Sequence, residues 1–298
     1  MFTGCGTALV TPFRRDLSLD EETLRQLVQR QIEAGINFLV PCGTTGESPT
    51  LTRAEHLRVV EIAIEEAQGR VPVLAGAGGY NTHEVIELAR ELADRGADGI
   101  LSVTPYYNKP TQEGLYQHYK AIAAAVRLPI VVYSVQGRTG VNVEPATLAR
   151  LAQIENIVGV KEASGNIGQM ATILNEVPST FTVLSGDDAV TIPLAALGGR
   201  GVISVVSNEI PGPMTELAQA CLRGDFEAAR RVQSRFLPLM NVNFVESNPI
   251  PVKAAMALMG LLEPVYRLPM VPPSPTSLAK IGKVLESLGL LRSATVAN

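Results

Sequence analysis

The sequence predicts an α/β fold, a (β/α)8 TIM barrel with a C-terminal helical extension. Short apolar runs alternate with longer amphipathic runs, eight of each, which is typical of consecutive parallel βα units. The short runs are apolar at successive positions, as expected of strands that helices cover. The eight units occupy about 220 residues, which suits a closed barrel better than an open sheet.

Each expected strand is five or six residues long and lies close to glycine or proline. An open doubly wound sheet usually has GxGxxG directly after its first strand, whereas here Gly4 and Gly6 lie at the beginning of that strand. In chain order, the expected strands span residues 5–10, 37–42, 71–75, 99–104, 129–134, 157–161, 181–185 and 201–206.

The amphipathic runs between the strands are predicted helices, and several have start signals, such as Thr52 or the Glu144-Pro145 pair. These helices span residues 20–34, 53–68, 82–95, 112–126, 145–153, 167–175, 189–197 and 213–222. Three further helices are expected at 225–239, 251–261 and 277–288. We therefore assign residues 1–223 to the barrel and 224–298 to a helical extension packed on it, together a single structural unit.

Composition and charge argue against several classes of function. Only 18% of the residues are charged and 46% are hydrophobic, which predicts a large interior. The net charge is −4 and no basic block occurs, so we expect neither nucleic acid nor a membrane surface as a partner. The three cysteines form no CxxC and the three histidines no HExxH, so we expect no metal site. The amino terminus lacks a basic region before its apolar stretch, and we expect a cytoplasmic protein.

Lys161 is the strongest candidate for chemistry. Of six lysines it alone lies in an expected strand, at the carboxyl end, where barrel enzymes place their active sites. Aliphatic surroundings favour the uncharged amine, which can attack a ketone and form a Schiff base. The alternative is a structural lysine paired with a carboxylate such as Glu162.

Two further candidates lie at or just after the carboxyl end of the preceding strand. Tyr133 ends that strand and could move a proton to or from an imine, although it could also be an interior tyrosine with a satisfied hydroxyl. Arg138 lies in a glycine-flanked loop, and a guanidinium there suits two-point binding of a carboxylate. The alternative for Arg138 is a loop side chain in solvent.

Two loops add candidate groups. The segment Gly43-Thr44-Thr45-Gly46-Glu47 follows the second strand and can offer amide donors and two hydroxyls to a small anion. It is not a P-loop, because no GK[ST] follows. Tyr106 and Tyr107 follow the fourth strand between two prolines, where they could serve an interface, a proton relay or simple loop packing.

With these residues assembled, the chain resembles the dihydrodipicolinate synthase (4-hydroxy-tetrahydrodipicolinate synthase) family, within the N-acetylneuraminate lyase superfamily of class I aldolases. The matching motifs run in order along nearly the whole chain, and together they are far more specific than any one alone. They are GTTGES at Gly43–Ser48, PYYNKP at Pro105–Pro110, GRTG at Gly137–Gly140, VGVKEASG at Val158–Gly165, LSGDD at Leu184–Asp188 and NPIPVK at Asn248–Lys253.

The resemblance implies a catalytic set. Lys161 matches the lysine that condenses with the ketone of pyruvate. Tyr133, Thr44 and Tyr107 match the proton relay, and the tyrosine matching Tyr107 reaches across a dimer interface into the neighbouring site. The family uses no metal or organic cofactor, and its usual assembly is a homotetramer, a dimer of dimers.

The resemblance also implies a substrate-binding set. Thr45 matches the residue that binds the pyruvate carboxylate, and Arg138 the one that holds the carboxylate of aspartate 4-semialdehyde. Two further members complete the set: the backbone carbonyl of Ile203, and Gly186 of the LSGDD motif. The implied activity is the condensation of these two substrates in lysine and diaminopimelate biosynthesis.

Two alternatives remain open. The first is another pyruvate-dependent aldolase, one that cleaves N-acetylneuraminate or a 2-keto-3-deoxy sugar acid; such an enzyme has little need for Arg138. The second is a non-catalytic ligand-binding barrel, which would have no use for the complete set of Lys161, Tyr133, Thr44 and Tyr107.

The sequence also departs from the family pattern. Ser134 and Gln136 replace the more common asparagine and proline after Tyr133. These replacements could alter the loop that carries Arg138, and with it the affinity for the second substrate. Tyr80 and Arg53 replace residues used by lysine-inhibited members. A bulky Tyr80 could fill the effector cleft, so we predict weak or absent inhibition by lysine.

Overall fold

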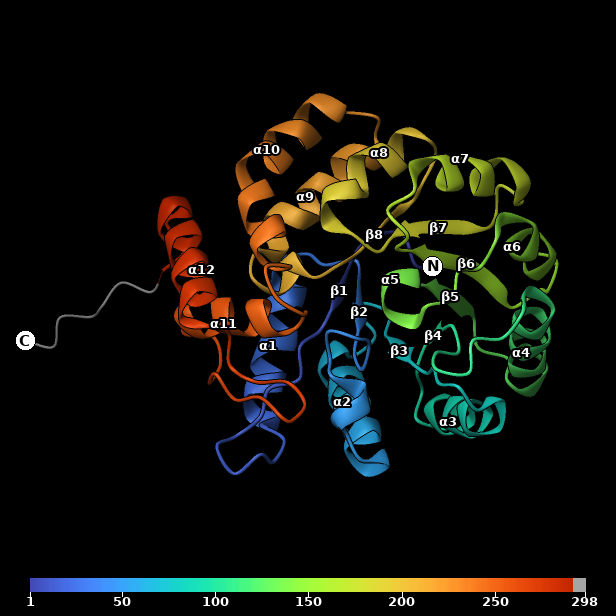
Figure 1. Ribbon diagram of the computed structural model, residues 1–298, viewed down its shortest axis with the longest axis horizontal. Helices are drawn as coiled ribbons and strands as arrows, with labels where there is room; N and C mark the ends of the chain where they lie inside the picture. Colours follow the sequence, from blue (N-terminus) through green and yellow to red (C-terminus); the bar gives the residue numbers. More distant parts are fainter. Residues whose placement is uncertain (292–298) are drawn as a thin grey trace, which may run out of the picture.

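Eight parallel strands form a barrel surrounded by helices, which confirms the predicted fold class (Figure 1). A computed structural model describes residues 1–291 of the chain. The strand order is β2-β1-β8-β7-β6-β5-β4-β3, and a parallel bridge between Leu39 and Val73 brings the two ends of the sheet together. The strands are β1 (Gly4–Ala8), β2 (Phe38–Val40), β3 (Leu74–Gly76), β4 (Gly99–Val103), β5 (Ile130–Ser134), β6 (Ile157–Glu162), β7 (Thr182–Ser185) and β8 (Gly201–Ser204).

The helices that cover the strands fall where the amphipathic runs predict them, with ends that differ by a few residues. They are α1 (Glu21–Glu33), α2 (Arg53–Ala67), α3 (Thr82–Asp94), α4 (Gln112–Ala125), α6 (Pro145–Leu151), α7 (Ile167–Glu176), α8 (Thr191–Ala196) and α9 (Pro211–Leu222). Short 3-10 turns occur at η1 (Ser48–Thr50), η2 (Asp188–Val190) and η3 (Val206–Asn208). The run expected as one helix over 189–197 is therefore divided between η2 and α8.

One element contradicts the sequence prediction. The segment carrying Arg138 was expected to be a loop, but it forms the short helix α5 (Gln136–Thr139). Gly140 ends this turn in the left-handed conformation, and its N–H donates to the Gln136 carbonyl at 2.9 Å. Glycine adopts that conformation without steric cost, so a single helical turn can close here.

Two apolar cores lie on opposite sides of the strands. The larger one fills the space between the strands and the ring of helices. The smaller one fills the barrel itself, with side chains such as Phe38, Leu74, Val131 and Ile203. The barrel is therefore a packed structure rather than a pore, and any site must lie at its mouth.

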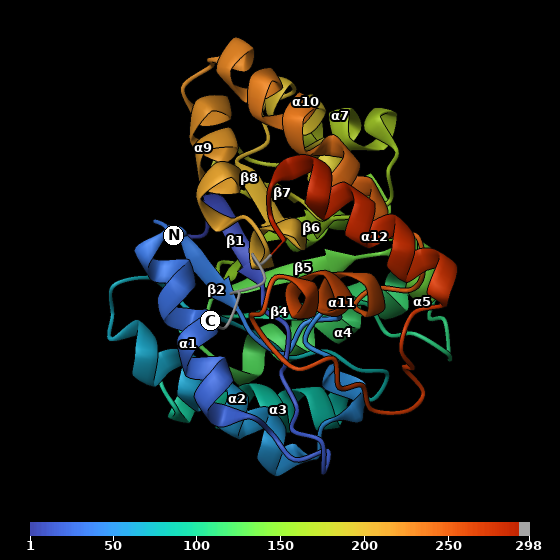
Figure 2. The ribbon, with the colours of Figure 1, turned by 90° about the vertical axis from the view of Figure 1, so that its left-hand side faces the viewer.

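The C-terminal extension consists of α10 (Phe226–Val242), α11 (Ile250–Leu258) and α12 (Pro275–Leu288), gathered on one side of the barrel near α9 and α1 (Figures 1 and 2). Val252 and Met256 of α11 pack against Val10 and Val205, which follow β1 and β8. This contact places α11 beside the carboxyl ends of the strands. The predicted boundary after residue 223 falls in the turn between α9 and α10, and residues 292–298 of the predicted extension lie outside the described residues.

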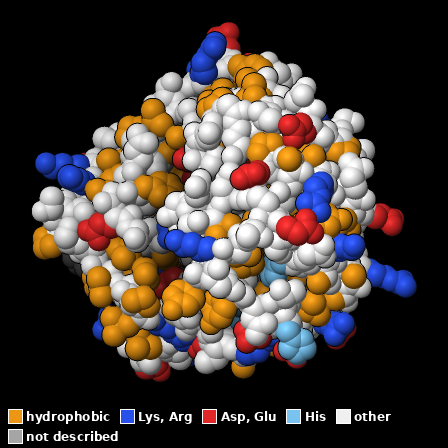
Figure 3. Space-filling model, turned by 45° about the vertical axis from the view of Figure 1, so that its right-hand side comes forward, with side chains coloured by type: hydrophobic (Ala, Val, Ile, Leu, Met, Phe, Trp, Pro, Cys, Tyr) orange, Lys and Arg blue, Asp and Glu red, His pale blue; other side chains and the backbone are white. Residues whose placement is uncertain are grey.

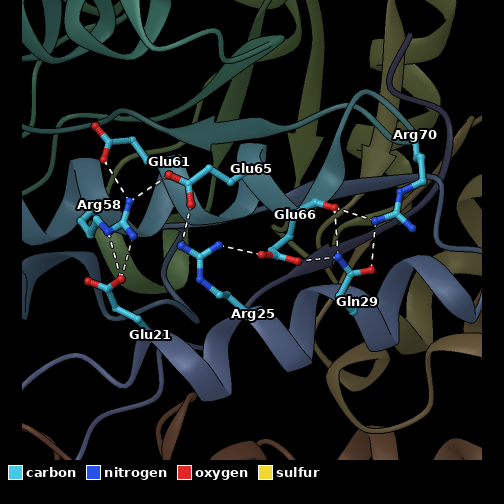
Figure 4. A network of polar contacts seen from close by, with 8 residues as sticks. All are labelled: Glu21, Arg25, Gln29, Arg58, Glu61, Glu65, Glu66 and Arg70. Carbon is cyan, nitrogen blue, oxygen red and sulfur yellow. Dashed lines mark hydrogen bonds and ion pairs between the residues drawn. The ribbon is translucent and has the colours of Figure 1, made fainter.

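A polar network joins α1 to α2 on the outside of the barrel (Figure 4). Arg58 of α2 pairs with Glu21 of α1 at 2.7 Å, and Arg25 of α1 pairs with Glu66 of α2 at 2.6 Å. Each partly exposed pair contributes only about 0–1 kcal/mol to stability. The network links one helix to the other, so we assign it to the scaffold.

The surface matches the low charge of the sequence. On the face drawn in Figure 3, basic side chains lie among acidic and uncharged ones rather than in one continuous field. Within residues 1–291, no helix has the length and apolarity needed to span a bilayer.

Candidate active site

Lys161 and Tyr133 lie side by side at the mouth of the barrel. They are register partners on the neighbouring strands β6 and β5, so their side chains point to the same face of the sheet. The Lys161 Nζ lies 4.2 Å from the centre of the Tyr133 ring. Lys161 is 5% exposed and Tyr133 is 6% exposed, so the amine is largely removed from water. This is the pairing expected of an amine nucleophile and its proton-transfer partner.

The alternative pairing of Lys161 with Glu162 is wrong. Adjacent residues of a strand point to opposite faces, and the Glu162 carboxylate instead accepts hydrogen bonds from the Ser164 N–H and the Gln169 side chain. Burial raises the pKa of Glu162, an effect that these hydrogen bonds oppose. In the part of the chain that the structure describes, no carboxylate lies within ion-pair distance of Lys161.

Of the two other residues expected to bind substrate, Gly186 follows β7 next to the lysine and Ile203 lies in β8. The Gly186 N–H donates to the Glu162 carbonyl at 2.7 Å. A Cβ at Gly186 would lie 2.5 Å from that of Ala163 and 3.1 Å from Cε of Lys161, so glycine leaves the room that the lysine stem occupies. Ile203 lies in the apolar interior of the barrel.

The turn after β2 carries Thr44 and Thr45. Thr44 is half-buried, whereas Thr45 is buried and its hydroxyl accepts a hydrogen bond from the Asn248 side chain at 3.0 Å. Two non-glycine residues of this turn, Cys42 and Glu47, have left-handed backbone conformations with φ of 56° and 53°. Such residues are held by their surroundings and occur often at functional sites.

A cavity of about 580 Å³ opens at this end of the barrel. Four predicted residues line it: Thr44, Tyr107, Tyr133 and Arg138. The other four, Lys161, Thr45, Ile203 and Gly186, do not line its walls. Lys161 is linked to the cavity through its contact with the Tyr133 ring.

Arg138 and Tyr107 lie at the edge of this cavity. Arg138 is exposed on α5, and its guanidinium donates to the Asn248 carbonyl at 3.2 Å. Tyr107 is 89% exposed and has a left-handed φ of 61°. Arg138 therefore faces the cavity rather than only solvent, and Tyr107 projects from the molecule.

The departures from the family pattern can be placed in the structure. The Ser134 hydroxyl accepts from the Val143 N–H, and Gln136 begins α5. The Tyr80 ring packs edge-on against Tyr106, which lines the same cavity. Arg53 pairs with Glu91 on α3 at 3.2 Å. Weak or absent inhibition by lysine stays a prediction.

Sequence reasoning missed a buried ion pair next to the site. Lys253 of α11 and Glu47 meet at 2.6 Å. Both residues lie in motifs shared with the family, GTTGES and NPIPVK, but nothing in either motif indicates that they meet. Their separation of 206 residues hides the pairing from any local pattern.

No metal-binding cluster accompanies these groups: among residues 1–291, no three or more His, Cys, Asp or Glu side chains are arranged to hold a metal ion. The three cysteines are unpaired and buried.

Comparison with known proteins gives a consistent result. The model of the dihydrodipicolinate synthetase family matches residues 1–288. The 4-hydroxy-tetrahydrodipicolinate synthase of Koribacter versatilis (strain Ellin345) is 55% identical over 295 residues, which cover 99% of this chain and 98% of that protein. The crystal structure of dihydrodipicolinate synthase from Aquifex aeolicus superposes with a TM-score of 0.96 at 44% identity, over 98% of this chain and 100% of the other. The chloride-inhibited dihydrodipicolinate synthase from Acinetobacter baumannii, complexed with pyruvate, gives a TM-score of 0.96 at 43% identity with the same coverage.

Proposed function

Since this chain belongs to the dihydrodipicolinate synthetase family, we propose that its cavity condenses pyruvate with aspartate 4-semialdehyde through a Schiff base on Lys161. The activity is that of a 4-hydroxy-tetrahydrodipicolinate synthase, a lyase of lysine and diaminopimelate biosynthesis. The observation that carries the mechanism is the buried contact between Lys161 and Tyr133 on adjacent strands.

The first half of the reaction uses the amine. The Lys161 Nζ attacks the ketone carbon of pyruvate through its lone pair, and water leaves as the imine forms. Loss of a proton from the methyl carbon gives an enamine. We assign proton transfer to and from these intermediates to Tyr133 and Thr44, which is supported by the contact of Tyr133 with the amine and by the position of Thr44 in the cavity wall.

The second half joins the two substrates. The enamine carbon attacks the aldehyde carbon of the semialdehyde, whose oxygen takes up a proton. The amino group of that substrate then attacks the imine carbon, closes the ring and releases Lys161. We assign the pyruvate carboxylate to the Thr45 region and the second carboxylate to Arg138 at the cavity edge.

This chemistry needs no metal or organic cofactor, because the protonated imine withdraws electrons from the neighbouring carbon. We further propose a homotetramer, a dimer of dimers, in which Tyr107 completes the site of a neighbouring subunit. The exposure of Tyr107 (89%) and Leu268 (80%) near the cavity edge supports this assembly. Buried, unpaired cysteines suit the cytoplasm that we propose as its location.

Trapping the imine tests the mechanism. The protein is incubated with pyruvate, reduced with borohydride, digested, and its peptides are weighed. We expect one adduct, on the peptide that contains Lys161. Lys253 is equally buried and serves as the internal control, because its ion pair with Glu47 keeps it from reacting.

The result separates the alternatives. Absence of any adduct on Lys161 would rule out the Schiff-base mechanism, and no adduct at all would favour a non-catalytic barrel. An adduct followed by turnover of sugar acids, but not of aspartate 4-semialdehyde, would favour the other aldolases.

A further inference from the structure

The ion pair of Lys253 and Glu47 is unusual among those of residues 1–291. The side chains are 0% and 1% exposed, whereas every side chain in the other ion pairs of the described chain is at least 13% exposed. The Lys253 Nζ also faces the rings of Phe13 at 4.5 Å and Tyr266 at 5.3 Å. The pair joins α11 of the extension to the turn after β2, two parts of the chain that are 206 residues apart.

Stability alone does not explain this pair. Taking two charges out of water costs free energy that their attraction often fails to exceed, and apolar side chains of similar volume are frequently as stable. Burial raises the pKa of Glu47 and lowers that of Lys253, and the charge of each partner opposes the shift of the other. A role in fixing one local arrangement is the best attested use of such a pair.

The arrangement that it fixes is the turn carrying the two threonines. The Gly46 N–H donates to the Gly43 carbonyl and the Glu47 N–H to the Thr44 carbonyl, both at 3.1 Å. Glu47 ends the turn in a left-handed conformation that a residue with a side chain rarely adopts. Its bond to Lys253 holds the side chain of this strained residue.

A second tie runs from the same part of the extension. Asn248, just before α11, donates to the Thr45 hydroxyl at 3.0 Å, and its carbonyl accepts from Arg138. The extension therefore contacts the turn at Thr45 and at Glu47, on either side of Gly46. Neither contact involves Lys161.

We propose that Lys253 and Glu47 are positioning residues, which hold the Gly43–Glu47 turn so that Thr44 and Thr45 face the bound keto acid. This inference rests on the proposed function. Its consequence is selective: loosening the turn should weaken the use of pyruvate, while the second substrate, assigned to Arg138, is little affected.

The test replaces both charges at once. The double variant Glu47→Met with Lys253→Met removes the pair without leaving a single charge buried. We expect a KM for pyruvate about tenfold higher, with the KM for aspartate 4-semialdehyde changed less than about twofold. Ile281→Ala is the matched control, because it loosens the extension at a fully buried position of α12 away from the turn.

Each outcome has a defined meaning. A pyruvate KM within twofold of the wild type, or the same selective rise in Ile281→Ala, would overturn the positioning role. If the double variant does not fold, Glu47→Asp keeps the charges but shortens the side chain that reaches Lys253. It should raise the pyruvate KM in the same selective way, and an unchanged KM in that variant would overturn the role.

Borohydride trapping on the wild type is run in parallel. Failure of the wild type to form the adduct counts against the proposed function, whereas equal trapping by wild type and variant at limiting pyruvate counts only against this inference.

Discussion

At the scale of single residues, the two buried lysines near the cavity differ in their partners. Lys161 and Lys253 are both buried, at 5% and 0% exposed. Both amines face aromatic rings, but Lys253 also has a carboxylate at 2.6 Å, whereas Lys161 has no carboxylate partner among residues 1–291. This difference in partners supports the two roles that we propose, a positioning residue at Lys253 and the nucleophile at Lys161.

Arg138 is the residue to which we assign recognition of the aldehyde substrate. We expect Arg138→Met to lower kcat/KM for aspartate 4-semialdehyde about 10- to 100-fold, the effect of losing one or two charge-assisted hydrogen bonds. The KM for pyruvate should change little, because Arg138 lies on α5 and not on the turn with Thr45. Steady-state kinetics with each substrate varied in turn measures both values.

The control for this experiment is Arg127→Met. Arg127 is exposed and precedes β5, whereas Arg138 follows it, so the two arginines lie at opposite ends of one strand. Unaltered kinetics are expected for Arg127→Met. Equal losses for both variants, or a loss confined to pyruvate, would contradict the assignment of Arg138.

At the scale of elements, Glu209 joins the segment after β8 to α10. The Oε2 of its carboxyl accepts a hydrogen bond from the Asn243 side-chain amide. The other carboxyl oxygen, Oε1, and the side-chain oxygen of Asn243, Oδ1, have no partner within the described residues. A proton on Glu209 would satisfy both oxygens at once. Burial raises the pKa of Glu209 well above its usual range, nearby Asp188 raises it further, and Asn243 and Arg30 oppose the shift.

This raised pKa makes stability depend on pH in a defined direction. A carboxyl whose pKa is higher in the folded protein than in the unfolded chain makes its full contribution to stability below the unfolded pKa of about 4.3. That contribution is lost as the pH rises toward the folded pKa. The Glu209→Gln variant keeps an equivalent pair with Asn243 but does not titrate. We expect the free energy of unfolding of this variant, relative to that of the wild type, to increase by up to about 1.4 kcal/mol per pH unit above pH 5.

Urea unfolding between pH 5 and 8 measures this difference. Glu227→Gln, an exposed position on the same helix α10, is the control and should give a difference that does not vary with pH. A constant difference for Glu209→Gln as well would show that Glu209 is ionised in the folded protein across this range.

The elements also show what the sequence could reveal. The strands and long helices were predictable because their hydrophobic periodicity is strong, and Lys161 and Tyr133 were predictable because each lies at the end of a strand. Helix α5 was missed because four residues that include Gly137 show no periodicity, and its closure depends on Gly140. The pair of Lys253 and Glu47 was missed because both side chains read as surface residues, and only the folded chain brings them together.

At the scale of the whole molecule, the side chain of Tyr107 projects outward from the chain. Tyr107 is 89% exposed in a left-handed conformation, next to a cavity that also contains Tyr133 and Thr44. A large apolar side chain held outward at the edge of a site suits contact with a second subunit. In a twofold dimer the same contact occurs twice, so each subunit would complete the site of the other.

Mixing two impaired variants tests this exchange. Lys161→Met has no nucleophile and Tyr107→Phe lacks the relay hydroxyl, so each alone should lose most activity. A mixed dimer has one site with both Lys161 and Tyr107 from different chains. Random reassociation of equal amounts makes half of the dimers mixed, so about a quarter of the wild-type activity should return if each site works independently.

Each variant taken alone through the same dissociation and reassociation is the control. Activity no higher than the average of the two separate variants would place Tyr107 in the site of its own subunit, because exchange between subunits is the only way in which these two chains can form a complete site.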